Sequence, residues 1–177
     1  KHGAEYEYDG LSHEVKGYDF ESDNELFVRD DLKYIGAGAD SIATGTLVGK
    51  YGMKFDETYF ENQNPNFDNV EITIVEDSLV IKPVAVHVTI TKHGAEYEYD
   101  GLSHEVKGYD FESDNELFVR NDLKFTGASE DSIATGTLVG KYGMRFTAAS
   151  FENMNPNFDN VEITIVEDSL VIKPVAV

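Results

Sequence analysis

Apolar and polar residues alternate along most of this chain, which is the pattern of half-buried β-strands. In Ala4–Tyr8, for example, two tyrosines face one side of the backbone and two glutamates face the other. The same period of two predicts strands over 13–21, with Gly17 as a bulge, and over 32–35, 41–46, 49–55, 70–75 and 79–81. Because Glu76-Asp77-Ser78 is a turn sequence between two apolar runs, we expect 70–81 to form a C-terminal hairpin.

Helical signals are confined to short stretches. Ser22-Asp23-Asn24-Glu25 fits a capping box that leads into residues 26–28. Asp56 or Thr147 is predicted to cap one or two turns that end near Phe60 or Phe151. The fold class is therefore mainly β.

An internal repeat organises the chain. Residues 1–10 return unchanged as 92–101, an offset of 91, and the aligned segments 1–86 and 92–177 differ at only 11 of 86 positions. Segments this similar must share one fold, so we predict two tandem copies of a small β domain, 1–86 and 87–177. Residues 87–91 alternate and run into Lys92, which predicts the first strand of the second domain. We therefore expect the first domain to begin partway through its own equivalent strand, with its N-terminal strand truncated.

Each repeat holds about seven predicted strands at the spacing of a small immunoglobulin-like sandwich, which is the preferred architecture. Tyr51, in Gly49-Lys50-Tyr51 directly after Thr46-Leu47-Val48, stands where such sandwiches carry a corner tyrosine. A β-grasp-like domain with one short helix is the alternative.

Composition excludes several function classes. The chain carries 34 acidic and 14 basic residues and a net charge of −20, which argues against binding to nucleic acid or to anionic lipid. With no cysteine, it has no disulfides, thiol nucleophiles or thiolate zinc sites. No apolar run approaches the roughly 18 residues of a membrane span, so none is expected.

Catalytic constellations are weak. Ser12, His13 and Asp9 offer a nucleophile, a base and an orienting acid, and the same three residues recur in the second repeat. Neighbouring residues on a strand point to opposite faces, so we expect a turn serine and a histidine that rests against Tyr6 or Tyr8. Paired carboxylates are abundant, but a β unit of this size has little surface for a glycosidase cleft. We predict that the chain is not an enzyme, with a hydrolase as the remote alternative.

Calcium is the one cofactor for which the sequence offers ligands. Hard cations take six to eight oxygens, and the loops at 19–24 and 64–69 supply carboxylate and amide oxygens at close spacing. The candidate ligands are three acidic residues of the first repeat and their counterparts in the second: Asp19, Glu21, Asp23, Asp110, Glu112 and Asp114. The alternative is that these side chains serve turns and helix caps.

One aromatic cluster is a candidate for ligand binding. Tyr59 and Phe60 lie between two glutamates, and an aromatic ring beside polar groups suits a sugar. In the second repeat Phe151 is retained while Ser150 replaces the tyrosine, so the two repeats would bind differently. The alternative is that Phe60 fills the core and Tyr59 is incidental surface.

Four motifs occur in the same order in both repeats. In the first repeat they are Tyr8–His13, Thr44–Gly49, Asn64–Val70 and Leu79–Pro83. Together they resemble the YDG-containing, MBG-like tandem repeats of large Gram-positive cell-surface proteins of the adhesin type, and the resemblance covers nearly all of each repeat. It implies secretion, display on the cell wall, a stalk or spacer role, neighbouring repeats as partners, and no catalytic residues. The alternative is that the repeat itself binds host glycan or mucin.

Overall fold

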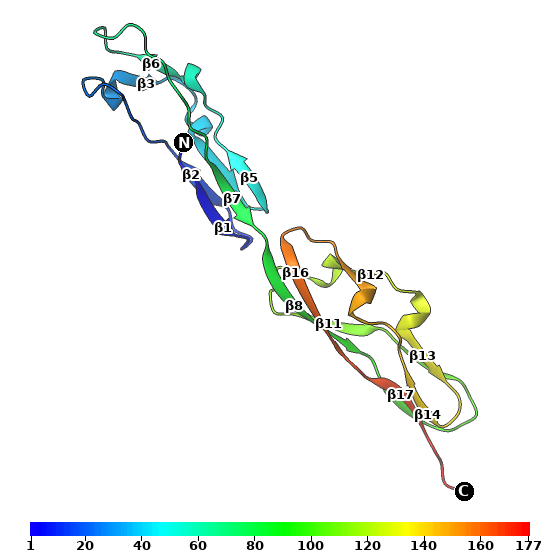
Figure 1. The fold of residues 1–177 in the computed structure, drawn as a ribbon. Helices are drawn as coiled ribbons and strands as arrows, with labels where there is room; N and C mark the ends of the chain where they lie inside the picture. Colours follow the sequence, from blue (N-terminus) through cyan, green and yellow to red (C-terminus); the bar gives the residue numbers. More distant parts are fainter. The chain divides into compact units, whose positions relative to one another are not determined.

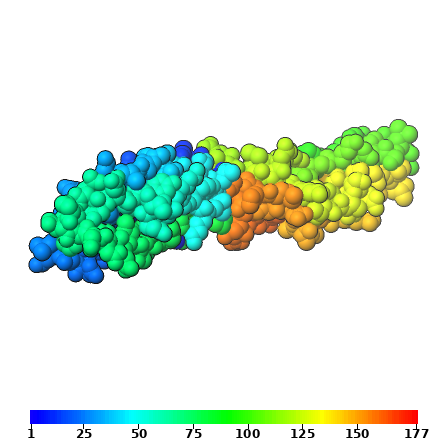
Figure 2. Space-filling view, turned by 90° about the horizontal axis from the view of Figure 1, so that it is seen from above, coloured from blue at the N-terminus to red at the C-terminus, as the bar shows by residue number.

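The chain is mainly β, as predicted, and divides into two compact units. In the computed structural model, strands hold 44% of the residues and every helix is a 3-10 turn of three or four residues. Unit 1 is Lys1–Pro83 and unit 2 is Val84–Val177 (Figure 1, Figure 2). None of the helices has the length and apolarity that crossing a membrane requires.

Unit 2 contains ten strands and three 3-10 turns. In chain order they are β8 (Val84–Lys92), β9 (Ala95–Glu98), β10 (His104–Lys107), β11 (Tyr109–Ser113), η4 (Arg120–Asp122), β12 (Leu123–Phe125), η5 (Ser129–Ser132), β13 (Ile133–Gly136), β14 (Gly140–Gly143), η6 (Ala148–Ser150), β15 (Phe151–Asn153), β16 (Phe158–Val166) and β17 (Ser169–Lys173). They form two three-stranded sheets, β11-β8-β16 and β14-β17-β9, and two pairs, β10-β13 and β12-β15.

Unit 1 contains seven strands and three 3-10 turns. They are β1 (Ala4–Glu7), β2 (His13–Lys16), η1 (Arg29–Asp31), β3 (Leu32–Tyr34), η2 (Gly38–Ser41), β4 (Ile42–Gly45), β5 (Gly49–Gly52), η3 (Glu57–Tyr59), β6 (Phe60–Asn62) and β7 (Ser78–Lys82). Each has a counterpart 91 residues later in unit 2. The sheets are β1-β7-β5, β2-β4 and β3-β6, so unit 1 has no counterpart of the β11-β8-β16 sheet.

The first and last segments of unit 2 run side by side in the same direction. β8 pairs in parallel with β16, from Val84 opposite Phe158 to Thr91 opposite Val166. Farther along, β9 pairs in parallel with β17. The chain therefore enters unit 2 at one end and leaves it at the other, as the path from β8 to β17 in Figure 1 shows.

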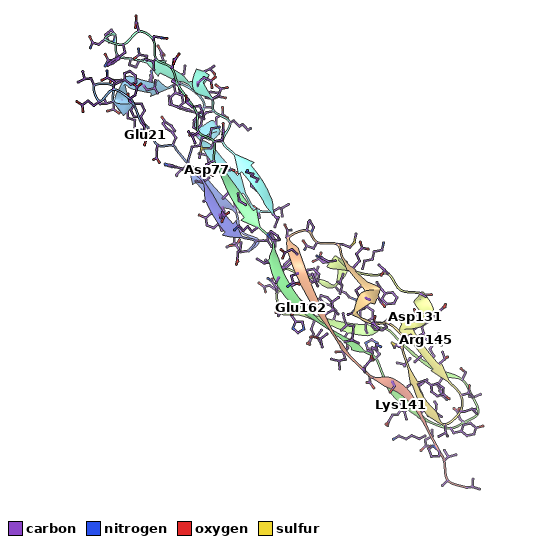
Figure 3. The ribbon with its side chains drawn as sticks, in the orientation of Figure 1. Glu21, Asp77, Asp131, Lys141, Arg145 and Glu162 are labelled. Carbon is purple, nitrogen blue, oxygen red and sulfur yellow. The ribbon has the colours of Figure 1, made fainter.

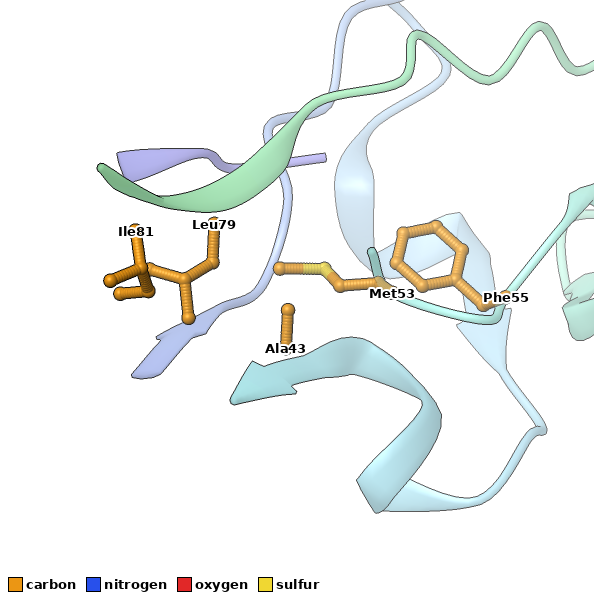
Figure 4. Close-up of a cluster of buried hydrophobic side chains, with 5 residues drawn as sticks. All are labelled: Ala43, Met53, Phe55, Leu79 and Ile81. Atoms are coloured by element: carbon orange, nitrogen blue, oxygen red, sulfur yellow. The ribbon is translucent and has the colours of Figure 1, made fainter. Parts of the chain in front are cut away.

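Alternation places one face of each central strand in the core. In unit 1 the buried cluster is Ala43, Met53, Phe55, Leu79 and Ile81 (Figure 4). The counterparts of these residues are buried in unit 2, where β8 adds Val86, Val88 and Ile90 to the interior. Unit 2 thus has, besides the cluster that both units share, the inward-facing aliphatic side chains of β8.

The predicted C-terminal hairpin is wrong. β16 lies beside β8, whereas β17 lies between β14 and β9, so the two strands belong to different sheets. In unit 1, residues 70–75 form no strand at all. The alternation of this segment fixed which side chains face inward, but a pattern of faces does not specify which strand pairs with which.

Two local predictions also need correction. The strand expected over 13–21 is broken at Gly17, whose φ of +84° ends β2, and in unit 2 Gly108 likewise separates β10 from β11. The capping box at 22–25 starts no helix. The side chain of Asn24 instead accepts a hydrogen bond from the backbone of Leu26, which makes a turn, and η1 begins only at Arg29.

Other local predictions are confirmed. Asp56 caps η3, because its Oδ1 accepts a hydrogen bond from the Thr58 backbone at 2.9 Å. The Tyr51 hydroxyl donates to the Leu47 carbonyl at 2.8 Å, and Tyr142 makes the same bond in unit 2. This bond to the backbone four residues upstream is that of a corner tyrosine. The strand predicted at 87–91 is part of β8, which begins three residues earlier, at Val84.

Candidate functional site

Unit 1 carries a groove of about 860 Å³ between two segments that form no strands. The first wall is 18–24 and the second wall is 66–75, and Lys1 lies at one end. Between the walls the groove is lined by aromatic side chains, among them Phe27, Phe55 and Phe60. Its lining is therefore mixed, with aromatic side chains between the walls and carboxylates along the first wall, where Figure 3 locates Glu21.

In unit 2 the counterparts of these two walls lie on either side of a strand. Every residue of 18–24 and 66–75 is repeated without change at 109–115 and 157–166. There the first segment forms β11, antiparallel to β8, and the second forms β16, parallel to β8. The unit 1 groove thus lies where β8 lies in unit 2.

Lys1 occupies the position of the last residue of β8. In unit 2 the Lys92 ammonium donates to the Met144 carbonyl at 2.9 Å and pairs with Glu167 at 2.8 Å, with 2% of its side chain exposed. The Lys1 ammonium donates to the Met53 carbonyl at 2.9 Å and pairs with the counterpart glutamate, Glu76, at 2.7 Å, with 3% exposed. One end of the groove is therefore already organised as it is beside β8.

Residues that line the groove are more exposed than their counterparts. Phe158 and Leu123 are 2% and 6% exposed in unit 2, whereas Phe67 and the equivalent leucine are half-buried in unit 1. Leu26 is 74% exposed, while Leu117 in unit 2 is half-buried. These residues are identical in the two units, so the difference in exposure comes from their surroundings, which in unit 2 include β8.

The first calcium candidate of each unit, Asp19 or Asp110, is hydrogen-bonded to a histidine. His2 Nε2 lies 2.8 Å from Asp19 Oδ1, and His2 Nδ1 lies 2.9 Å from a backbone carbonyl. The hydrogen bond to the carboxylate raises the pKa of His2 and lowers the pKa of Asp19. In unit 2 the pair His93 and Asp110, at 2.9 Å, repeats the arrangement and again raises the pKa of the histidine.

The other calcium candidates do not converge. Asp114 accepts a hydrogen bond from the His87 backbone at 2.9 Å, and Asp23 is its counterpart on the first wall of the groove. Glu21 and Glu112 are exposed side chains of the same segments. Nowhere do three or more His, Asp or Glu side chains gather as metal ligands. Calcium binding stays a prediction, without a preformed set of side-chain ligands.

The Ser12–His13 pair forms no catalytic arrangement. His13 Nε2 lies 2.9 Å from both carboxylate oxygens of Asp9, and its ring stacks on Tyr6 with centroids 4.1 Å apart. The Leu11 backbone also donates to Asp9, and these bonds lower the pKa of that carboxyl. The histidine is therefore a packed side chain against Tyr6, as predicted, with no bond to the serine.

The aromatic candidates contact other rings. Phe60 lies 5.3 Å from Tyr18 and 5.7 Å from Phe55, between centroids, and Phe151 has the equivalent neighbours in unit 2. Tyr59 stacks on Tyr34 at 5.9 Å, and its hydroxyl donates to an aspartate, Asp40, at 3.0 Å. That hydrogen bond raises the pKa of Tyr59. These rings pack against the body of each unit, which leaves less of their faces for stacking on a sugar.

Comparison with known proteins adds no assignment to this geometry. No family model, no curated protein and no solved structure matches the chain. The most informative comparison lies within the chain itself, because the same residues stand in two different surroundings in unit 1 and unit 2.

Proposed function

We propose that this chain is a non-catalytic repeat module that serves as a stalk or spacer in a bacterial surface protein of the adhesin type, displayed outside the cell on the wall. The observation that carries the proposal is the parallel path through unit 2, in which β8 to β9 and β16 to β17 run the same way. A unit that the chain enters at one end and leaves at the other adds its own length to any protein that contains it. With nine and four residues in β8 and β9, and about 3.3 Å per residue, that length is roughly 40 Å.

The fold and the charge support the same role. We infer that each repeat is an immunoglobulin-like sandwich, since unit 1 has seven strands and both units have the corner-tyrosine bond. A net charge of −20 keeps such units soluble and makes like-charged neighbours repel. The four ordered motifs that resemble Gram-positive surface repeats support the cell-wall location, and neighbouring repeats are the expected partners.

The spacer role is tested by measuring height above a surface. The chain is fused between a surface-bound anchor and a fluorescent domain, and the height of the fluorophore is measured by interference microscopy with and without the 177 residues. We expect the chain to raise the fluorophore by roughly 40 Å or more, the length of at least one unit. A rise of less than half that value would refute the spacer role.

A second arm tests the alternative that the repeat binds a ligand. The purified chain is passed over immobilised host-type mucin glycans. An unrelated protein of similar net negative charge serves as the control. A spacer predicts retention no greater than that of the control. Saturable retention that free glycan competes away would favour the binding module instead.

A further inference from the structure

We propose that the buried ammonium of Lys92 makes the last contact to form when unit 2 folds, and that this contact sets how long the unit stays folded. The Lys92 contact comprises its hydrogen bond to the Met144 carbonyl and its ion pair with Glu167. Loss of the contact would accelerate unfolding and leave the refolding rate unchanged. The inference concerns the lifetime of the folded unit and does not depend on the spacer role.

Lys92 is the only polar or charged residue among the buried residues of the chain. It faces inward from β8 in line with Val88 and Ile90, and 2% of its side chain is exposed. Its Nζ lies 4.6 Å from the centroid of the Phe146 ring. Removing an ammonium from water is costly unless it is paired, so this side chain stays inside only while its partners are in place.

The partners of Lys92 come from distant parts of the sequence. Nζ donates to the Met144 carbonyl, 52 residues away in the chain, and to the Glu167 carboxylate, 75 residues away, each at 2.9 Å. Met144 directly follows β14, and Glu167 lies between β16 and β17. The contact therefore joins the end of β8, in the sheet β11-β8-β16, to residues that border the sheet β14-β17-β9.

This sequence separation places the contact late in folding. Closing loops of 52 and 75 residues costs chain entropy that one side-chain contact does not recover, so strand pairing must bring the three segments together first. An interaction that is absent from the folding transition state affects the unfolding rate and not the folding rate. The Tyr142 hydroxyl bond, which joins residues only four apart, carries no such requirement.

Unit 1 contains the same contact at the counterpart lysine. Lys1 Nζ donates to the Met53 carbonyl at 2.9 Å, pairs with Glu76 at 2.7 Å, and lies 4.8 Å from the centroid of the Phe55 ring. Its side chain is 3% exposed. An arrangement that is satisfied in the same way in both units belongs to the fold of the repeat.

An exposed ion pair of unit 2 provides the matched control. Lys173 Nζ lies 2.9 Å from Glu96 and joins two parallel strands, β17 and β9. The two side chains are 52% and 64% exposed, and exposed ion pairs contribute little to stability. Burial therefore distinguishes the two lysine–glutamate pairs of the same unit.

The experiment measures the unfolding and refolding rates of unit 2 in the full chain. Urea jumps are followed by pulsed hydrogen exchange and mass spectrometry. Peptides that include a position differing between the repeats, all of which lie in 30–63 and 121–154, report on one unit alone. We expect Lys92→Ala to make unit 2 unfold roughly 10- to 100-fold faster, the equivalent of one hydrogen bond to a charged group. Its refolding rate should stay within about twofold of wild type. Lys173→Ala should change the unfolding rate less than about fivefold.

Glu167→Ala removes the other partner of the ion pair. The Glu167 side chain is 69% exposed, so its truncation removes little packing and tests the contact even where Lys92→Ala does not fold. We again expect faster unfolding, with refolding within about twofold of wild type.

Three results would overturn the proposal. One is a refolding rate that falls as much as the unfolding rate rises, which would show that the contact is already formed in the transition state. Another is an unfolding rate within about twofold of wild type in the Lys92 and Glu167 variants. The third is an equal acceleration in Lys173→Ala, which would show that burial of the ion pair plays no part.

Discussion

Truncation of one phenylalanine in each unit measures what β8 contributes to stability. Phe158 begins β16 opposite Val84, is 2% exposed, and packs on Phe118 with centroids 5.1 Å apart. Its counterpart Phe67 makes the same ring contact, with Phe27 at 5.1 Å, but is half-buried beside the groove. Replacing a buried phenylalanine by alanine costs about 3–5 kcal/mol. We expect Phe158→Ala to destabilise unit 2 by about that amount and Phe67→Ala to destabilise unit 1 by roughly half as much, because less surface is removed from water in the native state.

Urea unfolding followed by pulsed hydrogen exchange reports the two units separately. With an m-value of roughly 1.5–2 kcal/mol/M for a unit of this size, Phe158→Ala should lower the midpoint of unit 2 by about 2 M. Phe67→Ala should lower the midpoint of unit 1 by about 1 M, and each variant should leave the other unit within experimental error. Equal midpoint shifts in the two units would refute the reasoning, because they would show that β8 adds nothing to the burial of this ring.

Three further predictions concern local contacts. The pKa of His2 and of His93 is raised in the folded state, so their ion pairs stabilise the fold below the ordinary pKa of 6.5, and this stability is lost as pH rises through the higher folded-state pKa. The double variant His2→Gln, His93→Gln should therefore show a flatter dependence of Tm on pH between about pH 5 and 8.5. An unchanged slope would contradict the assignment. Tyr142→Phe removes the corner bond and should cost about 1 kcal/mol by chemical denaturation, whereas a loss below about 0.3 kcal/mol would show that the bond is not stabilising. Gly108→Ala, at a φ of +86°, should cost about 1–2 kcal/mol, while Gly143→Ala, where a new Cβ meets open space, serves as the control and should cost less.

The repeat and the main strands were predictable because they follow from local information. An offset of 91 residues can be counted, and the alternation in 87–91 marks β8 whatever its neighbours are. Tyr51 was likewise predictable, since the bond to Leu47 joins residues only four apart. The Asp56 cap depends on an equally short separation.

Strand pairing was not predictable from the same information. Residues 70–75 read as the first arm of a hairpin, yet their counterparts in unit 2 pair with β8, which lies more than 70 residues earlier in the chain. Without that partner the same sequence in unit 1 forms no strand. The alternating segment before Lys92 indicates the strand β8 itself, but not that it lies between β11 and β16. The two loops named for their oxygens, 19–24 and 64–69, both border the groove, but nothing in their composition indicates that they lie opposite each other.

The parallel course of β8 and β16 also determines how unit 2 resists tension. Traction that pulls Val84 and Lys173 apart draws β8 toward its amino end and β16, through β17, toward the carboxyl end, so the two strands slide along each other in shear. The eight paired positions from Phe158 to Val166 then share the load together, instead of opening one after another as in an unzipped hairpin. Forced unfolding is governed by the unfolding rate, so this geometry raises the force at which the unit opens without requiring a larger equilibrium stability.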